Sequence, residues 1–588
     1  MMETSGKFRF RLFICLLTWI SAGFSLPAPA ADLVLEFRHF WNGAPIELSG
    51  KWFDRVGGDS ISFSRIDYLV SGPVLEDSGD RRLAREDWFG LVNAGDPVSR
   101  LQLKGLPGNL FSVIEFSVGL DEKTNGSDPS LYPANHPLNP VLNNLHWSWQ
   151  GGYIFLAMEG HLRAKSGDSM GFSYHIGNTP HRMKVRLPLK LDLSRPARLS
   201  LDFHLDRVLS DGRSVSPEGR SSTHGRKGDP LAMLLKKNVE NAFVVGGVVY
   251  EKPVIKPVSD PAKKSPGVGT PYAFRLKKGF PVPALPIDFP LTIERVELGR
   301  RLFNDVSLSS AGSISCASCH IQSNAFSDPV RFSKGVGGQL GNRNSMSLAN
   351  MAWKRSFFWD GRVSSIREQA LEALQNPSEM DADLNNVVAL LKKHPSYPSL
   401  FKSAFGNQKV TPERIAVAIE QFVLTITSMD SRFDQSMRGQ VELSPEEKRG
   451  FELFFTEYDP RRKLYGADCF HCHGGSFFTD HGFHNNGLGG VAEDIGLARI
   501  TGRQADHQKF ATPSLRNVAI TPPYMHDGRF KSIEEVVEHY TSGIKRTASL
   551  DPNLSKHGVK GIFLSLGDRA ALVAFLRTLT DPKFKKGE

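Results

Sequence analysis

Two short cysteine–histidine motifs place the strongest constraint on how this chain can fold. They are Cys316-Ala317-Ser318-Cys319-His320 and Cys469-Phe470-His471-Cys472-His473, about 150 residues apart. A C-x-x-C-H motif is the attachment signature of c-type haem, in which both thiols bond haem vinyl groups and the histidine ligates the iron. A chain with two such motifs has to build two pockets for a porphyrin.

The cysteine count favours haem attachment over its two alternatives, disulfide bonds or a zinc site. The chain has five cysteines, and Cys15 lies in an N-terminal segment that we expect to be removed. The other four are all in the two motifs, and neither alternative explains a histidine directly after both pairs. We therefore expect two covalent haems and no disulfide bond.

The first 30 residues have the pattern of an export signal. Three basic residues precede the apolar run Leu12–Ile20, and Ala28-Pro29-Ala30 resembles a cleavage site. The run is short for a membrane span, although an uncleaved anchor is the alternative. We expect a periplasmic mature protein, in an oxidising compartment.

Composition excludes several broad classes of protein. The chain has 588 residues, 40% of them hydrophobic and 23% charged, which excludes a fully disordered or fibrous protein and argues against a polytopic membrane protein. Its net charge is +10, but no basic block is interleaved with aromatic residues. We expect no nucleic-acid partner and no stable membrane span in the mature chain.

Hydrophobic patterning divides the chain into a β-rich part and a helical part. Alternating runs across residues 31–248 predict an all-β, sandwich- or barrel-like domain. The Pro- and Lys-rich stretch 249–290 predicts an extended linker. Helical spacing follows, and the two motifs divide this mainly α-helical part into haem lobes at 291–430 and 431–588.

The helical part resembles the bacterial di-haem cytochrome c peroxidase and MauG superfamily. The resemblance implies an oxidoreductase that acts on hydrogen peroxide, with His320 and His473 as the iron ligands. Besides the two motifs, the matching strings are Glu297–Phe303, Phe357–Arg362, Thr512–Val518 and Pro523–Gly528.

Around the first haem, the sequence departs from many peroxidases of this superfamily. Those proteins supply a distal iron ligand from a Gly-His-Gly string, which here is Gly335-Val336-Gly337. Valine cannot ligate iron, so the resemblance implies an open site for peroxide, as on the MauG side. It also implies that Glu379 is the catalytic acid–base group, assisted by Gln369. Taken alone, Glu379 would be interpreted as a solvated loop acid.

Around the second haem, the resemblance separates the two branches of the superfamily. Tyr540 occupies the position where peroxidases usually carry methionine and MauG-type enzymes carry a tyrosine ligand. A phenolate favours ferric and higher oxidation states of iron. His539 and Met525 are rival ligands, and a buried core tyrosine is the alternative. Trp359 matches a tryptophan that relays electrons between the haems, with core packing as its alternative.

The resemblance also implies a structural calcium ion between the lobes. Its ligands would be the side chain of Asn344 and the backbone carbonyls of Thr521 and Pro523. Oxygen ligands suit calcium, although such carbonyls are also ordinary loop atoms.

Residues from about 32 to 245 resemble the MbnP-like copper-binding proteins. In the best-described members a tryptophan is oxidised to kynurenine beside histidine ligands, by a separate MauG-like di-haem partner, MbnH. Here the two kinds of domain share one chain, and a tether raises their effective concentration. The matching strings are Phe37–Gly43, Arg65–Ser71, His146–Tyr153 and Phe172–Gly177.

Imidazole suits copper, and His39 and His175 match these strings best. They are therefore the predicted copper ligands, with His204 and His224 as further candidates. A lone histidine in a β-domain is more often an ordinary surface or core residue.

We choose Trp88 as the oxidised tryptophan. Trp147 and Trp149 alternate on one strand face, as core residues would. Trp41 and Trp52 remain alternatives, and packing is the usual role of any tryptophan.

Three functions remain open at this stage. The first is a MauG-type enzyme that uses peroxide to oxidise a tryptophan of its own copper-binding domain. The second is a cytochrome c peroxidase that takes electrons from a small cytochrome, against which Val336 and Tyr540 argue. The third is a copper-binding protein whose haem part acts only once, during maturation. A small cytochrome or a copper protein is a possible partner.

Overall fold

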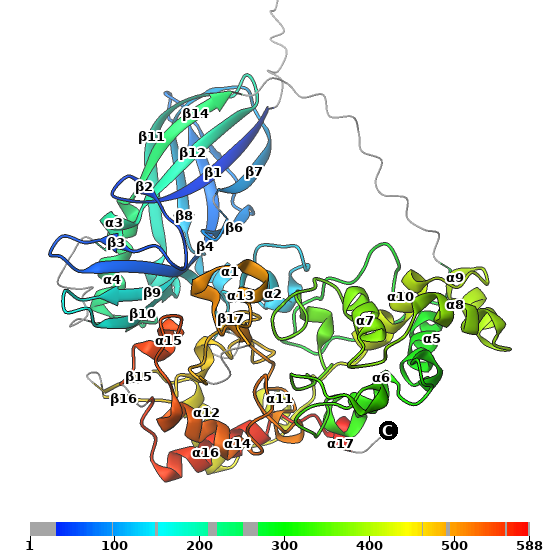
Figure 1. Cartoon of the computed structure of the whole chain (residues 1–588). Coiled ribbons are helices and arrows are strands. Elements are labelled where there is room, and N and C mark those ends of the chain that lie inside the picture. Colours follow the sequence, from blue (N-terminus) through cyan, green and yellow to red (C-terminus); the bar gives the residue numbers. More distant parts are fainter. Residues whose placement is uncertain are drawn as a thin grey trace, which may run out of the picture.

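The N-terminal part is an all-β domain of two sheets, as the patterning predicts (Figure 1). The first sheet runs β14 (Phe243–Tyr250), β12 (Ala197–His204), β1 (Ala31–Trp41) and β2 (Ala44–Pro45), with β7 (Ser99–Leu106) also paired to β1. The second runs β11 (Met183–Asp192), β8 (Leu110–Val118), β4 (Ser60–Glu76), β9 (Ile154–Arg163), β10 (Ser169–Gly177) and β13 (Ser222–Thr223). Three short strands also pair with β4: β3 (Phe53–Asp54), β5 (Arg82–Ala84) and β6 (Phe89–Asn93).

Side-chain alternation explains why these segments form a sandwich. Along β11, Val185, Leu187 and Leu191 are buried, whereas the intervening Lys184 and Arg186 are exposed. Strand side chains point alternately to the two faces, so one face of β11 is apolar. Residues of both sheets belong to a single hydrophobic core.

The structure describes residues 31–585 except 97, 148–150, 210–219, 251–267, 461–462, 490–493 and 559–560. The predicted export signal and Trp149 therefore lie outside the described residues. Within them, no helix is long and apolar enough to cross a membrane.

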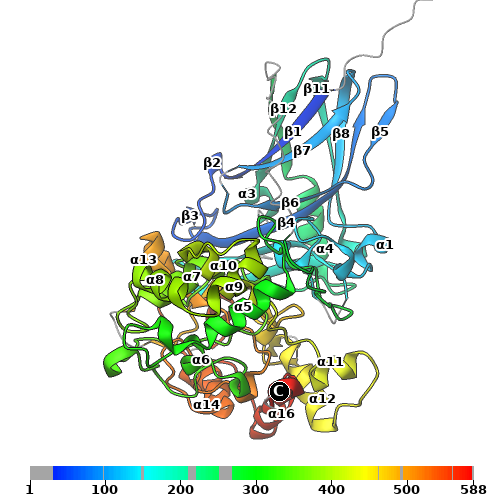
Figure 2. The same ribbon diagram turned by 90° about the vertical axis from the view of Figure 1, so that its right-hand side faces the viewer.

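The C-terminal part is helical and contains two lobes (Figure 2). The first contains α5 (Ile293–Phe303), α6 (Cys316–Cys319), α7 (Ile366–Gln375), α8 (Leu384–Lys393), α9 (Tyr397–Phe405) and α10 (Pro412–Leu424). The second contains α11 (Arg432–Met437), α12 (Pro445–Phe454), α13 (Ala498–Thr501), α14 (Ile533–Glu538), α15 (Pro552–Ser555) and α16 (Leu566–Arg577). The last helix, α17 (Pro582–Lys585), returns to the first lobe, where Phe584 joins its hydrophobic core.

Each lobe is built around one tightly packed helix pair. In the first, α5 packs on α10, and a Cβ at Gly299 would lie 1.8 Å from the carbonyl oxygen of Ala418. In the second, α12 packs on α16, and a Cβ at Gly450 would lie 1.9 Å from the carbonyl oxygen of Ala571. The two lobes therefore use the same close approach of a glycine to a facing backbone.

The chain between the two parts packs partly on the helical lobes. Phe280 is buried and its ring contacts Phe477 at 5.5 Å between centroids. Trp353 Nε1 donates to the carbonyl of Pro281 at 2.7 Å. The described part of the predicted linker is thus held to the lobes, and its remaining residues, 251–267, lie outside the described chain.

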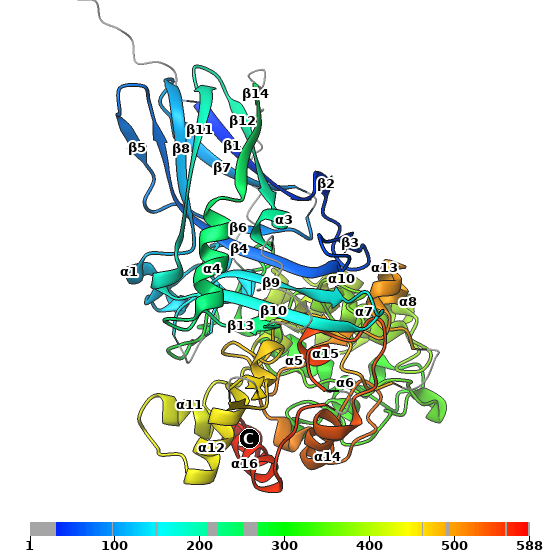
Figure 3. The same cartoon turned by 90° about the vertical axis from the view of Figure 1, so that its left-hand side faces the viewer.

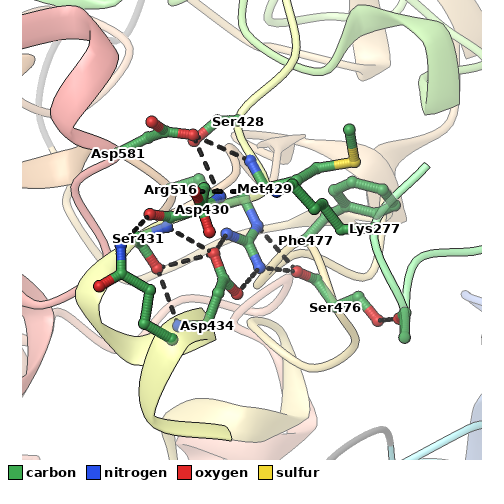
Figure 4. A network of polar contacts seen from close by, with 12 residues as sticks. Lys277, Ser428, Met429, Asp430, Ser431, Asp434, Ser476, Phe477, Arg516 and Asp581 are labelled. Carbon is green, nitrogen blue, oxygen red and sulfur yellow. Dashed lines mark hydrogen bonds and ion pairs between the residues drawn. The ribbon is translucent and has the colours of Figure 1, made fainter. Parts of the chain in front are cut away.

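A buried ion pair fixes the loop that follows the second motif (Figure 4). Arg516 contacts both carboxylate oxygens of Asp434, at 2.8 and 2.9 Å, and also donates to the carbonyl of Ser476. Bidentate pairs of this kind add geometric specificity to charge attraction. The arginine therefore joins α11, the Thr512–Val518 string and the residues just after His473.

The β-domain docks on the second lobe through β9 and β10, which lie beside α15 (Figures 1 and 3). A Cβ at Gly171 would lie 1.9 Å from the carbonyl oxygen of Pro552, so the two backbones approach closely there. Asn553 Nδ2 donates to Glu159 Oε2 at 3.2 Å. The edge of a sheet is thus packed directly against the lobe that carries the second motif.

We predict that Gly450→Ala destabilises the protein by about 1–3 kcal/mol, the usual cost of overpacking a close contact. Alanine favours helix formation more than glycine does, so helix propensity alone would make the variant more stable. A lower free energy of unfolding therefore reports the close contact. Gly567→Ala in α16 is the matched control, because nothing lies closer than 4.0 Å to a Cβ there. Unfolding free energies from denaturant titration measure both, and equal stability of the two variants would contradict the packing argument.

Candidate functional site

Both motifs present their histidine in the same way. His320 Nδ1 donates to the carbonyl of Phe326 at 2.8 Å, and His473 Nδ1 donates to the carbonyl of Phe478 at 3.0 Å. A neutral imidazole that donates from Nδ1 keeps its lone pair on Nε2. The two backbone carbonyls therefore fix the tautomer and ring orientation that an iron ligand needs.

All four motif cysteines are free thiols. Burial raises the pKa of Cys316 to about 12 and that of Cys472 to about 11. Such thiols are protonated at neutral pH and do not form the exposed thiolates typical of catalytic cysteines.

The predicted acid of the first site lies beside the string that lacks a distal histidine. The backbone N–H of Val336 donates to the carbonyl of Glu379 at 2.8 Å, and Asn376 Nδ2 donates to Glu379 Oε1 at 2.8 Å. Burial raises the pKa of Glu379. The charge of Glu379 adds to the burial that raises the pKa of Cys316 and Cys319, so the acid is close to both thiols.

Gln369 lies on α7, and Glu379 lies just beyond the end of the same helix. Gln369 is half-buried. The structure thus places both predicted residues of the peroxide pocket on neighbouring segments, and their catalytic roles stay predictions.

A cavity of about 270 Å³ with a mainly apolar wall lies beside the second motif. Cys469, Cys472 and His473 line it, and so do Tyr540 and Met525. Two of the three rival ligands therefore face the space next to His473.

The third rival ligand, His539, faces elsewhere. Its Nε2 donates to the carbonyl of Asn486 at 3.0 Å. Tyr540 is the next residue, in the π-helical turn His539–Gly543 that continues α14. Single π-turns often occur at functional sites, and this one directs the tyrosine into the cavity. Burial raises the pKa of Tyr540 to about 12.

Trp359 and the predicted calcium ligands line the same cavity. Trp359 Nε1 donates to the carbonyl of Asn344 at 2.8 Å, and its ring meets that of His526 edge-on, at 6.5 Å between centroids. Asn344, Thr521 and Pro523 all line the cavity wall. The structure brings these residues together, and both the relay role and the calcium ion stay predictions.

The two predicted copper ligands lie in different surroundings. His39, on β1, is buried, and its Nε2 lies 3.2 Å from the hydroxyl of Tyr68. His175, on β10, is also buried, and its Nε2 donates to Glu159 Oε1 at 2.8 Å. Burial lowers the pKa of each histidine to about 4, so both are neutral at physiological pH. Their roles as copper ligands stay predictions.

His175 belongs to a group of three histidines that does not include His39. One ring nitrogen each of His175, His224 and His471 lies within 4.8 Å of the others. His224 was a further candidate from the sequence, whereas His471 was missed. The signal was its position inside the second motif, where the first motif has Ser318.

The predicted modified tryptophan lies apart from this group. Trp88 is half-buried against the core of the β-domain, and its Nε1 donates to the carbonyl of Gln102 at 3.1 Å. Among the described residues, Trp147 is the tryptophan that shares a small cavity of about 40 Å³ with His175 and His471.

Comparisons with known proteins identify both parts of the chain. The family model for di-haem cytochrome c peroxidase matches residues 293–442, and the MbnP model matches residues 30–223. MauG of Methylorubrum extorquens is 36% identical over 294 residues, which are 49% of this chain and 79% of that protein. Cytochrome c551 peroxidase of Nitrosomonas europaea is 34% identical over 303 residues, which are 50% of this chain and 83% of that protein. The chain belongs to the di-haem cytochrome c peroxidase family.

A solved structure also resembles this peroxidase. It is the crystal structure of a MauG-like protein associated with microbial copper homeostasis, at 35% sequence identity and a TM-score of 0.48. The match covers 54% of this peroxidase and all of that chain.

The residues of the peroxidase fit two covalent haems. Each motif offers two thiols and a histidine whose Nδ1 donates to a backbone carbonyl, and a large apolar cavity lies beside the second motif. When bound, the haems supply the redox chemistry of the family. The protein supplies ligands, exclusion of water and a buried acid.

We predict that Tyr540→Phe changes the absorption and electron paramagnetic resonance spectra of one ferric haem, because it removes the phenolic oxygen but keeps the ring. Tyr524→Phe is the matched control: Tyr524 lines the same cavity, but its hydroxyl donates to the carbonyl of Val518 at 2.8 Å. If Tyr540→Phe leaves the spectra unchanged while Met525→Leu alters them, methionine is the ligand instead.

Proposed function

We propose that this peroxidase is of the MauG type and uses hydrogen peroxide to oxidise a tryptophan, to kynurenine, in its own copper-binding domain. The observation that carries the proposal is the docking of that domain on the second haem motif. The ring of His471, inside the motif, lies 5.4 Å from that of His175 and 4.9 Å from that of His224, between centroids. The domain to be oxidised thus touches the chain segment that holds a haem.

Residues of the first lobe support an open peroxide site. Val336 offers no ligand side chain where many family members have a histidine. Glu379 is buried, and Asn376 Nδ2 holds one of its oxygens. A carboxylate in this position takes a proton from one peroxide oxygen and returns it to the other, which makes water the leaving group. Gln369 orients the peroxide in this proposal.

Residues of the second lobe favour a haem that oxidises a substrate over a haem that accepts electrons from an external donor protein. Tyr540 offers a phenolic oxygen to the cavity that His473 lines. Such a ligand favours the higher oxidation states of iron. Trp359, on the same wall, relays charge between the haems. Asn344, beside it, holds the structural calcium ion together with Thr521 and Pro523.

Two tryptophans compete as the oxidised residue. Trp88 is our choice from the sequence, whereas the cavity shared with His175 and His471 favours Trp147. Copper binding belongs to the same domain, with His175 as a ligand and His39 as the second candidate from the sequence. An N-terminal export signal and a periplasmic location complete the proposal.

Peptide mass spectrometry of the mature holoprotein, with and without peroxide, tests the proposal. We expect the mass shift of kynurenine on Trp88 or Trp147, and its loss in the corresponding Trp→Phe variant but not in the other. No shift on any N-terminal tryptophan, together with rapid oxidation of an added reduced cytochrome, would favour a conventional cytochrome c peroxidase. A shift without continued peroxide turnover would favour a haem part that acts only during maturation.

We predict that Glu379→Gln slows the reaction with peroxide by about 10²–10⁴-fold, the usual contribution of general acid–base catalysis. Stopped-flow absorption of the haems measures the rate. Glu297→Gln, an exposed acid on α5, is the control and should react at the normal rate.

The pH dependence follows from the raised pKa of Glu379. The carboxylate is the form that accepts the peroxide proton, so the rate of the unmodified protein should rise as pH increases through that pKa. The glutamine variant should lack this step. A variant that keeps both rate and pH profile would exclude Glu379 as the acid–base group.

A further inference from the structure

Three histidines from both parts of the chain meet at the interface between them. His175 comes from β10 and His224 directly follows β13, both at the sheet edge that faces the second lobe. His471 comes from the turn of the second haem motif. One nitrogen of each ring lies within 4.8 Å of the other two. Histidines far apart in sequence thus meet at one point of the interface.

Each of these imidazoles has one nitrogen next to a carboxylate. His175 Nε2 donates to Glu159 Oε1 at 2.8 Å. His224 Nδ1 lies 3.3 Å from Glu457 Oε2. His471 Nε2 lies 3.0 Å from Asp468 Oδ1 and 3.1 Å from Lys556 Nζ. Histidines that bind metals almost always pass their other N–H to a carboxylate or carbonyl, which fixes the tautomer and strengthens the ligand.

The opposite nitrogen of each ring is buried and has no hydrogen-bond partner among the described residues: His175 Nδ1, His224 Nε2 and His471 Nδ1. Buried polar atoms are nearly always paired, because an unpaired one has lost its water without replacement. Three such atoms on three converging rings therefore call for a shared partner. A metal ion accepts the lone pairs of all three at once.

We propose that His175, His224 and His471 together bind one copper ion at the interface. Imidazole ligands suit copper, zinc, iron or nickel, and divalent copper binds such sites more tightly than the other three ions. The choice of copper rests on the copper link of the proposed function, whereas the three-histidine geometry does not depend on it.

Charge at the site favours a cation. The three carboxylates beside the histidines are Glu159, Glu457 and Asp468. Two cations face them: the half-buried Arg65, 3.2 Å from Glu159 and 2.6 Å from Asp67, and Lys556, 3.1 Å from Asp468. With Asp67 counted, four carboxylates face two cations, which leaves room for a bound positive ion.

The site requires both parts of the chain, so it goes beyond a copper site within the β-domain. Haem attachment does not explain the histidine, since Ser318 occupies the same position in the first motif. His471 comes two residues before His473 in the chain, so an ion bound to His471 would lie near the second haem motif. Copper binding would therefore stabilise the docked arrangement, because a ligand that binds one state shifts the population toward it.

The test measures metal content of the full-length protein with both haems attached. Metal is first removed with a chelator, and copper is then added and the excess dialysed away. The haem iron serves as an internal standard for mass spectrometry of the elements. We expect a copper-to-iron ratio near one to two in the unmodified protein, and at least a fivefold lower ratio in His471→Ser, His175→Gln and His224→Gln. The bound divalent copper should show nitrogen couplings of several imidazoles in pulsed electron paramagnetic resonance.

His39→Gln is the discriminating control. If His39 is the ligand, this variant loses copper while His471→Ser keeps it, and that result overturns the proposal. Equal copper in His471→Ser and the unmodified protein overturns it as well, and binding of added zinc but not copper overturns the choice of metal. His471→Ser restores the residue of the first motif, so two haems should still attach; His175→Gln and His224→Gln change no residue of the motif. Because no peroxide is used, the outcome is independent of whether any tryptophan is oxidised.

Discussion

The buried carboxylate of Glu159 helps to join the two parts of this peroxidase. It accepts hydrogen bonds from His175 at 2.8 Å, from Arg65 at 3.2 Å and, across the interface, from Asn553 at 3.2 Å. Burial alone would raise its pKa, but the hydrogen bond from His175 and the charge of Arg65 hold the pKa of Glu159 well below its ordinary value. The group therefore stays charged, and a buried charge is tolerated only while its partners stay in place. Docking and the orientation of His175 depend on the same few atoms.

That docking brings the sheet edge of the β-domain to one lobe in particular. The edge packs on the second lobe, where β9 and β10 lie against α15, whereas Val141 of the β-domain packs against the core of the first lobe. The buried acid Glu379 and the string around Val336 belong to the first lobe. This arrangement fits the division of labour in our proposal, in which the first lobe has an open site for peroxide and the second lobe, closed by Tyr540, lies against the domain that is oxidised. Trp359 lies on a wall of the cavity in the second lobe.

Sequence alone predicted the parts of this design that depend on local chemistry. Motif spacing predicted the haem ligands, and strand alternation such as that of β11 predicted the β-domain that the structure shows, since both patterns are read within a few residues. His471 was missed because its significance arises only when β10 and β13 dock on the motif. The linker shows the same limit: its prolines predicted an extended chain, whereas Phe280 and Pro281 pack on the lobes through contacts with distant residues.

Fusion of the two domains changes what the interface has to achieve. Two separate proteins have to offset the loss of translational and rotational freedom each time they associate, whereas a tether removes most of that cost. An interface within one chain can therefore be small and polar and still be occupied. The contacts seen here fit that expectation: a glycine without a side chain at the closest approach, a few hydrogen bonds such as that from Asn553, and a group of polar rings rather than a broad apolar patch. Such an interface can include ionisable and metal-binding groups that a purely hydrophobic contact would exclude, and in our proposal this places copper binding by one domain beside the haem chemistry of the other.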